Sequence, residues 1–104
     1  SPDKLNMGGK EYKTGYIMKR TYSNKYAYFN LDSQYTVIEG EIGPLNNYDG
    51  ILNIYLDGKL HDTIEVKGNE MPRKFSIPVK GVIQLRLECE SYYHTLGLGD
   101  LIIK

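Results

Sequence analysis

The feature of this sequence that most constrains its fold is an alternation of apolar and polar side chains with a period of two. In residues 83–90 the odd positions hold Ile, Leu, Leu and Cys, whereas the even positions hold Gln, Arg, Glu and Glu. Successive side chains of a β-strand point to opposite faces, so this pattern predicts a strand with one face in the core and the other in water. We find no segment with the period of an amphipathic helix. The sequence therefore predicts an all-β domain.

The same alternation predicts nine short strands, at residues 4–8, 15–18, 26–31, 35–42, 50–57, 60–67, 74–79, 82–90 and 98–103. Asp57-Gly58 suits a tight turn with positive φ, so the two strands that flank it are expected to form a hairpin. In residues 35–42 the apolar side chains change face, which predicts a β-bulge near Glu39 and Gly40. This pattern favours an antiparallel β-sandwich of jelly-roll type with about eight to nine short strands.

The balance of basic and acidic residues argues against nucleic acid as a binding partner. The chain has 104 residues with 13 basic and 13 acidic side chains, so its formal net charge is zero. Binding to a phosphate backbone draws on surplus positive charge, and nucleic acid is therefore not expected as a partner. No apolar run reaches the ~20 residues of a membrane-spanning helix, so no membrane insertion is expected.

The composition is even from end to end, and residues 1–104 are expected to form a single domain. The first residues, Ser-Pro-Asp-Lys, contain neither an initiator Met nor a signal peptide. We therefore expect the domain to be a piece of a larger protein.

The connections between the predicted strands alternate between short and long. The short turns are at residues 32–34, 57–59 and 80–81, and the longer loops are at residues 19–25, 43–49, 68–73 and 91–97. Successive connections of antiparallel strands fall at opposite ends of a sheet, so all the long loops are expected at one end. Loops on a rigid scaffold are where binding residues concentrate, and this end is the predicted binding surface.

Tyrosine is the over-represented residue, with ten Tyr and no Trp in the chain. A Tyr ring offers an apolar face and a hydroxyl, which suit both the C–H faces of sugars and protein surfaces. We expect Tyr28 and Tyr35 to fill the sandwich or its margin, and Tyr55 to make a cross-strand contact on a solvent face. The candidate ligand-binding residues lie in the long loops: Tyr48, Tyr92 and Tyr93 to stack on a sugar, with Asn46, Asn47, Asp49, Arg20 and His94 as polar contacts.

Residues with catalytic potential are few, and the chain is not expected to be an enzyme. Neither His61 nor His94 belongs to a recognisable Ser-His-Asp or Cys-His order. Cys89 falls on the apolar face of its strand and is expected to be a buried small hydrophobe. As the single cysteine of the chain, it also excludes a Cys-rich zinc site. The strand carboxylates are expected on solvent faces, at Glu65, Glu88 and Glu90.

Oxygen ligands for a metal ion are sparse, and a calcium site would need extra carbonyl groups or water to complete its shell. Asn46, Asn47 and Asp49 share one loop, and Asp100 follows near the end of the chain. Ca²⁺ takes six to eight oxygen ligands, and Asn and Asp are ordinary turn-forming residues. We therefore expect no metal ion and no cofactor.

Several further segments follow one another along nearly the whole chain. They are Met-Gly-Gly-Lys-Glu-Tyr-Lys-Thr-Gly at 7–15, Tyr-Phe-Asn-Leu at 28–31, Tyr35 with Glu39-Gly40, Ile-Tyr-Leu-Asp-Gly-Lys at 54–59, Val-Lys-Gly-Val-Ile-Gln-Leu-Arg-Leu at 79–87, and Gly-Asp at 99–100. Their order and spacing resemble the NPCBM family, carbohydrate-binding modules found on bacterial cell-surface proteins and glycoside hydrolases.

The resemblance implies a non-catalytic carbohydrate-binding module of a bacterial extracellular or cell-surface protein. We expect weak glycan binding at the long-loop end, where the longer connections gather. The alternative is a structural or protein–protein interaction module without a sugar ligand, in which the same Tyr-rich end docks a neighbouring domain or forms a dimer.

Overall fold

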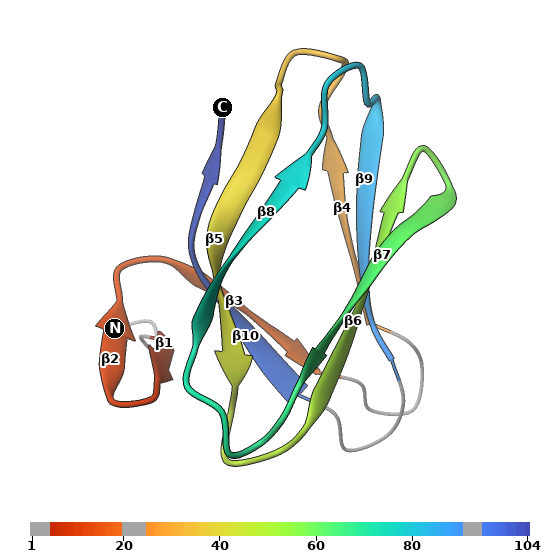
Figure 1. Ribbon diagram of the computed structural model, residues 1–104. Coiled ribbons are helices and arrows are strands. Elements are labelled where there is room, and N and C mark those ends of the chain that lie inside the picture. Colours follow the sequence, from red (N-terminus) through yellow and green to blue (C-terminus); the bar gives the residue numbers. More distant parts are fainter. Residues whose placement is uncertain (1–4, 20–24, 91–94) are drawn as a thin grey trace.

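The computed structural model describes residues 5–19, 25–90 and 95–104, and all regular secondary structure in these segments is β (Figure 1). The described part of the chain holds no helix, and so none that is long and apolar enough to span a membrane. The strands are β1 (Leu5–Met7), β2 (Lys10–Tyr12), β3 (Gly15–Lys19), β4 (Lys25–Asn30), β5 (Val37–Pro44), β6 (Gly50–Leu56), β7 (Lys59–Val66), β8 (Arg73–Pro78), β9 (Gln84–Cys89) and β10 (Thr95–Ile103).

Strands β3 to β10 form two antiparallel sheets that share one hydrophobic core. The strand order is β3-β10-β5-β8 in the first sheet and β4-β9-β6-β7 in the second. Early strands therefore pair with late ones: β3 with β10, β4 with β9, β5 with β8, and β6 with β7. A long hairpin wound into two layers has this pairing, which is the topology of a jelly roll. The predicted antiparallel β-sandwich is confirmed.

The inward side chains of both sheets fill the space between them. In β9 the alternation holds for Leu85, Leu87 and Cys89, all of which are buried. Together the sheets and their turns bury Met18, Leu31, Ile38, Ile42, Leu52, Ile54, Val66, Ile77, Val79, Val82, Leu85, Leu87, Cys89, Leu96 and Leu98.

Ile83, which the same alternation assigns to the core, is 59% exposed, so that prediction is wrong. The strand begins only at Gln84, and Ile83 belongs to the preceding turn. There its carbonyl oxygen accepts hydrogen bonds from the backbone N–H groups of Leu31 and Asp32. The turn geometry, rather than the strand period, therefore decides the direction of this side chain.

The bulge predicted within residues 35–42 lies instead on the neighbouring strand β10. Strand β5 pairs with β8 without irregularity, whereas the register between β10 and β5 shifts between Gly99 and Ile102. Within β5, Ile38 and Ile42 point to the core, whereas Val37, the first residue of the strand, is only half-buried. Tyr35 precedes the strand and does not share its alternation.

The hairpin of β1 and β2 packs on the outer face of the first sheet, and the sequence does not predict β2. Leu5, Met7 and Tyr12 form a second small core, against which Leu45 packs. The glycines of β10 make room for this hairpin: a Cβ atom on Gly99 would lie 2.3 Å from Cδ1 of Tyr12. The three residues of β2, Lys-Glu-Tyr, contain one side chain that turns inward and so show no alternation by which the strand could be recognised.

The two ends of the sandwich carry different connections. Figure 1 shows the connections at residues 31–36, 57–58 and 79–83 at one end, and those at residues 45–49 and 67–72 at the other. We call the latter two the loop end. The other two predicted long loops lie mostly outside the described residues. The strand ends that flank them do reach the loop end, because the end of β3 and the end of β5 both pair with the start of β10.

The contact between the hairpin and β10 predicts the effect of Gly99→Ala. The added methyl group would overlap the Tyr12 ring, because the two atoms would be 2.3 Å apart without rearrangement. We expect the free energy of unfolding to fall by about 1–3 kcal/mol, as for other overpacked sites. Urea denaturation followed by circular dichroism measures this change.

The control is the same substitution in a Tyr12→Ala background, where the ring is absent. The added cost of Gly99→Ala should be smaller there, because contacting residues are energetically coupled. An equal cost in both backgrounds would show that the ring is not the cause.

Candidate functional site

The loop end is built around a tight turn at residues 45–48. The backbone N–H of Tyr48 donates a hydrogen bond to the carbonyl oxygen of Leu45 at 3.0 Å. Asn46 and Asn47, the two central residues, have positive φ angles of 53° and 61°. This is the backbone of a type I′ turn, which Asn adopts more readily than most residues. The side chains of both Asn residues are left exposed.

Asp49 joins this turn to the other connection of the loop end. Its Oδ1 accepts a hydrogen bond from the backbone N–H of Gly68 at 2.7 Å. A Cβ atom on Gly68 would lie 2.1 Å from the backbone oxygen of Asn47, so glycine is required at this close approach. The Asp49 carboxylate therefore holds the turn in place, a role that sequence reasoning missed because its partner is 19 residues away.

Tyr48 presents its aromatic side chain to solvent at the described part of the loop end and is 52% exposed. Of the eight predicted ligand-binding residues, the structure places four in this one turn: Asn46, Asn47, Tyr48 and Asp49. The other four lie outside the described residues: Arg20, Tyr92, Tyr93 and His94.

The described residues contain no group of three His, Cys, Asp or Glu side chains placed to hold a metal ion. Asp100, one of the oxygen ligands considered from the sequence, has a structural partner instead. Its Oδ1 accepts hydrogen bonds from the backbone N–H groups of Lys13 and Thr14, at 3.1 and 3.3 Å. Asp100 thereby fastens the β2–β3 connection to the bulge of β10.

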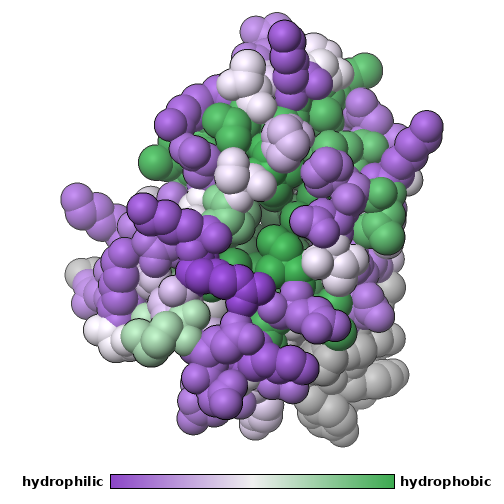
Figure 2. Space-filling view, in the orientation of Figure 1, coloured by the Kyte–Doolittle hydropathy of each residue, from purple (hydrophilic) through white to green (hydrophobic). Residues whose placement is uncertain are grey.

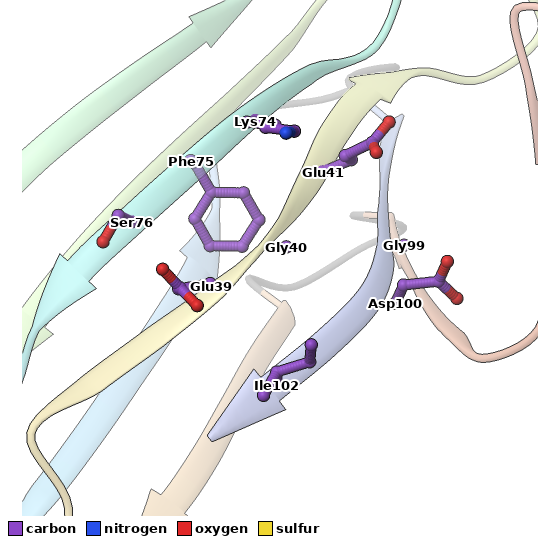
Figure 3. Close-up of a pocket in the computed structure, with 9 residues that line it drawn as sticks. All are labelled: Glu39, Gly40, Glu41, Lys74, Phe75, Ser76, Gly99, Asp100 and Ile102. Atoms are coloured by element: carbon purple, nitrogen blue, oxygen red, sulfur yellow. The ribbon is translucent and has the colours of Figure 1, made fainter. Parts of the chain in front are cut away.

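A hollow of about 530 Å³ lies beside the β1–β2 hairpin on the outer face of the first sheet (Figure 3). Glu39 and Glu41 of β5 are the cross-strand partners of Ser76 and Lys74 of β8, so these four side chains share one face. The lining consists of Glu39, Gly40, Glu41, Lys74, Phe75, Ser76, Gly99, Asp100 and Ile102. Sequence reasoning did not find this hollow, because its residues come from three strands that are distant in the sequence.

Both glutamates of the hollow contact basic side chains. Glu41 accepts hydrogen bonds from the hydroxyl of Tyr12 at 2.7 Å and from Nζ of Lys10 at 2.9 Å. These two hydrogen bonds hold the pKa of Glu41 below its ordinary value, against the opposing effect of burial. Oε1 of Glu39 lies 2.9 Å from Nζ of Lys104. The charge of each of these two glutamates is therefore partly balanced by one lysine at the rim of the hollow.

A groove runs between the edge strands β7 and β8, where Figure 2 shows apolar residues bordered by hydrophilic ones. It encloses about 720 Å³ and is lined by Asp62, Thr63, Ile64, Glu65, Lys67, Glu70, Arg73, Lys74, Phe75 and Ser76. Arg73 crosses it, donating from Nη2 to the backbone oxygen of Glu65 at 2.7 Å and pairing with Glu70. Acidic and basic residues balance along the rim, so the groove favours neither charge sign.

A polar network covers the outer face of the second sheet. Nδ2 of Asn53 and the hydroxyl of Tyr55 both donate to Oε1 of Glu88, at 3.1 and 3.2 Å. The guanidinium carbon of Arg86 lies 4.0 Å from the centroid of the Tyr55 ring and 5.3 Å from that of Tyr26. Glu88 is only 8% exposed, so its predicted solvated position is wrong. The predicted cross-strand contact of Tyr55 is confirmed.

Glu88 is ionised within this network. Burial acts to raise its pKa, but hydrogen bonds from Asn53, Tyr26 and Tyr55 and the charge of Arg86 outweigh burial, and the pKa lies below its ordinary value. The buried carboxylate thus accepts hydrogen bonds from three neighbours and organises this face of the sheet.

Tyr28 lies on the same outer face and is 56% exposed, so the prediction that it fills the sandwich is wrong. Its neighbours Ala27 and Phe29 are the residues of β4 that pack against the core. Tyr35 is also exposed, in the connection that precedes β5.

Cys89 is buried, as predicted. Burial, together with the neighbouring charge of Glu88, raises the pKa of its thiol to about 11. The thiol is therefore protonated at neutral pH, as expected for a buried small hydrophobe. The other two strand carboxylates, Glu65 and Glu90, are exposed as predicted.

Solved structures with the same fold are carbohydrate-binding modules of bacterial proteins. A CBM51 of Clostridium perfringens GH95, in complex with methyl-galactose, is 16% identical, with a TM-score of 0.73 over 98% of this chain and 81% of that chain. The CBM51-2 and INT domains of C. perfringens ZmpB, with GlcNAc bound to CBM51-2, are 12% identical, with a TM-score of 0.74 over 90% and 22% of the two chains. The tandem CBM51 modules of Sp3GH98, a family 98 glycoside hydrolase of Streptococcus pneumoniae, are 12% identical, with a TM-score of 0.67 over 90% and 32%.

At these identities the likeness shows that this chain has the fold of a CBM51 module. The chain spans less than a quarter of the ZmpB chain and most of the GH95 module. No protein-family model and no curated protein sequence matches the chain.

The Glu88 network predicts a loss of stability on Glu88→Ala. The substitution removes the acceptor of the hydrogen bonds from Asn53 and Tyr55; Asn53 keeps its second bond, to Oε2 of Glu90 at 2.7 Å, whereas the Tyr55 hydroxyl loses its bond to Glu88. We expect the free energy of unfolding at neutral pH to fall by about 1–3 kcal/mol. Urea denaturation measures it, with Glu65→Ala on exposed β7 as the control, which should change stability by no more than about 0.5 kcal/mol.

The pH dependence of this loss has a defined sign. The pKa of Glu88 is lower in the folded protein than in the unfolded chain, where a Glu titrates near ~4.3. Its stabilisation is therefore complete above that value and disappears as the pH falls through the folded-state pKa. The stability difference between wild type and Glu88→Ala should narrow as the pH is lowered below about 4. A difference that stays constant from neutral pH into this acidic range would contradict the ionised state of Glu88.

Proposed function

We propose that this domain is a non-catalytic carbohydrate-binding module of the NPCBM type that binds glycan weakly through the loop end. The fold it shares with CBM51 modules supports this proposal, since structures of two of those modules hold methyl-galactose or GlcNAc. The order of sequence segments that resembles the NPCBM family is independent support. By the same analogy, we propose that the parent protein is bacterial and acts outside the cell or at the cell surface.

The single observation on which the proposed binding site rests is the exposed Tyr48 ring on a rigid turn. A half-exposed aromatic ring can stack on the C–H face of a sugar. The exposed amides of Asn46 and Asn47, in the same turn, can donate to and accept from hydroxyl groups. The hydrogen bond from Gly68 to Asp49 fixes the turn, so little conformational entropy is lost on binding.

The same surface predicts that binding is weak. Only one aromatic ring of the described residues is exposed at the loop end, and the turn is open to water on its outer side. A bound sugar therefore desolvates few groups. The entropy lost when the sugar is held in place offsets much of the free energy that its contacts contribute. Arg20, Tyr92, Tyr93 and His94 belong to segments whose flanking strands reach this end, and we propose that they add contacts to the same ligand.

The second candidate function is a protein–protein interaction module, which would dock a neighbouring domain or form a dimer. The observation that favours it is the exposed aromatic face of the second sheet, where the Tyr26 and Tyr28 ring centroids are 6.1 Å apart. Tyr is enriched at protein interfaces. Sedimentation velocity over a range of concentrations tests the dimer, because self-association raises the sedimentation coefficient as the concentration rises, whereas a monomer gives no such rise.

The glycan proposal is tested by titrating the ¹⁵N-labelled chain with methyl-galactose and with GlcNAc at millimolar concentrations. We expect chemical-shift changes at the amides of residues 45–49. Tyr48→Ala should weaken binding by about 3- to 10-fold, the loss of one stacking contact.

Tyr28→Ala is the matched control, because Tyr28 is as exposed as Tyr48 but lies on a sheet face. It should leave the affinity for both sugars unchanged. The absence of any shift change in residues 45–49 with either sugar, or an equal loss of affinity in both variants, would rule out Tyr48 as the stacking residue.

A further inference from the structure

We infer that the hollow between β5, β8 and β10 is a second sugar-binding site, which takes a single uncharged monosaccharide. The choice of ligand class rests on the proposed function, but the site itself does not involve the loop end. At about 530 Å³, the hollow lies within the range of ~300–1,000 Å³ that is typical of small-molecule sites.

The hollow lies where the sheet is irregular, at a glycine of β5 that faces a bulge in β10. A Cβ atom on Gly40 would lie 3.0 Å from the backbone oxygen of Gly99 and from Cδ2 of Leu101, and 3.2 Å from Cε1 of Phe75, so glycine lets these groups pack closely beneath the hollow. Opposite Gly40, the register of β10 shifts after Gly99, and Asp100 takes a positive φ of 51°. Bulges of this kind commonly re-aim side chains next to functional sites.

The polar groups around the hollow suit hydroxyl groups. Figure 3 shows Glu39 and Glu41 on either side of Gly40, with Lys74 and Ser76 on the facing strand. A carboxylate has about four acceptor positions, so the contacts of Glu41 with Lys10 and Tyr12, and of Glu39 with Lys104, leave room for a hydroxyl donor. The ammonium of Lys74 is a donor, and the hydroxyl of Ser76 is both donor and acceptor.

The apolar part of the lining suits the C–H face of a sugar ring. Phe75 and Ile102 both line the hollow, and Phe75 is only half-buried. Most ligand sites combine such an apolar surface with a few convergent polar groups. A pyranose, with an apolar face and hydroxyls around its rim, matches both parts of this lining.

The charges argue for an uncharged ligand. Glu41 is hydrogen-bonded to Lys10 and Tyr12, and Glu39 is paired with Lys104, so a cation would have to compete with lysines already in place. An anion would meet the carboxylates of Glu39, Glu41 and Asp100 against the single ammonium of Lys74 among the lining residues. A neutral, hydroxyl-rich molecule neither competes with the bound lysines nor is repelled by the carboxylates.

A second site would make the module bivalent. The hollow lies on the side of the sandwich, whereas Tyr48 lies at its end, so one sugar cannot fill both. Two weak sites on one domain raise the avidity for branched or densely displayed glycans without any new contact.

The test is a titration of the ¹⁵N-labelled 104-residue chain with methyl-galactose and with GlcNAc, in wild type and three variants. Lys74→Ala removes the donor of the hollow, Ser76→Phe fills it, and Tyr48→Ala removes the proposed loop-end ring. Lys59→Ala, an exposed lysine of the other sheet, is the matched control. A dispersed amide spectrum shows that each variant is folded. If Ser76→Phe does not fold, Lys74→Ala alone tests the hollow.

We expect sugar-dependent shifts at the amides of Glu39, Gly40 and Ser76 in wild type, in Tyr48→Ala and in Lys59→Ala. They should be absent in Ser76→Phe, and Lys74→Ala should weaken binding about tenfold, as expected for one hydrogen bond from a charged donor. Shifts in the hollow without shifts in residues 45–49 would support this inference and overturn the loop-end proposal. Shifts in residues 45–49 alone would overturn the second site, and the absence of both would overturn both.

Discussion

The constraint on which the whole structure depends is the burial of alternate side chains between two four-stranded sheets. Residues such as Leu87 of β9 and Leu98 of β10 are inaccessible to water because each sheet covers the other. A shift of one residue in any strand would turn its apolar side chains outward, so this burial fixes the register. It thereby also decides which side chains face outward and which connections lie at each end. Every surface considered for binding follows from that register.

The two outer faces of the sandwich are completed in different ways. On the first sheet, the β1–β2 hairpin covers the glycines of β10 and is held by Glu41 through Lys10 and Tyr12. On the second sheet, none of the described strands covers the outer face, and the network around Glu88 pairs the polar groups of Asn53 and Tyr55 there instead. The hairpin leaves a hollow beside it on the first sheet, whereas the polar network leaves a rigid outer face with exposed Tyr rings on the second sheet.

Much of the fold was predictable, and about half of the candidate site. The buried residues of β9 follow from the period of two, and the Asn46-Asn47 turn follows from the preference of Asn for positive φ. Both signals are local, so a few neighbouring residues suffice to read them. The contact of Asp49 with Gly68 joins two residues that are 19 positions apart, and neither segment contains a sequence signal that predicts it. The same holds for the hollow, which three separate strands create.

The all-β class, the sandwich and the division of its connections between two ends could be read from the chain as a pattern, because they follow from strand period and turn chemistry. The burial of Glu88, the bulge on β10 and the packing of the hairpin on Gly99 could not, because each depends on which strands become neighbours. A carboxylate on a strand is solvated or buried according to the donors that its neighbours supply. That information exists only once strands distant in the sequence lie side by side.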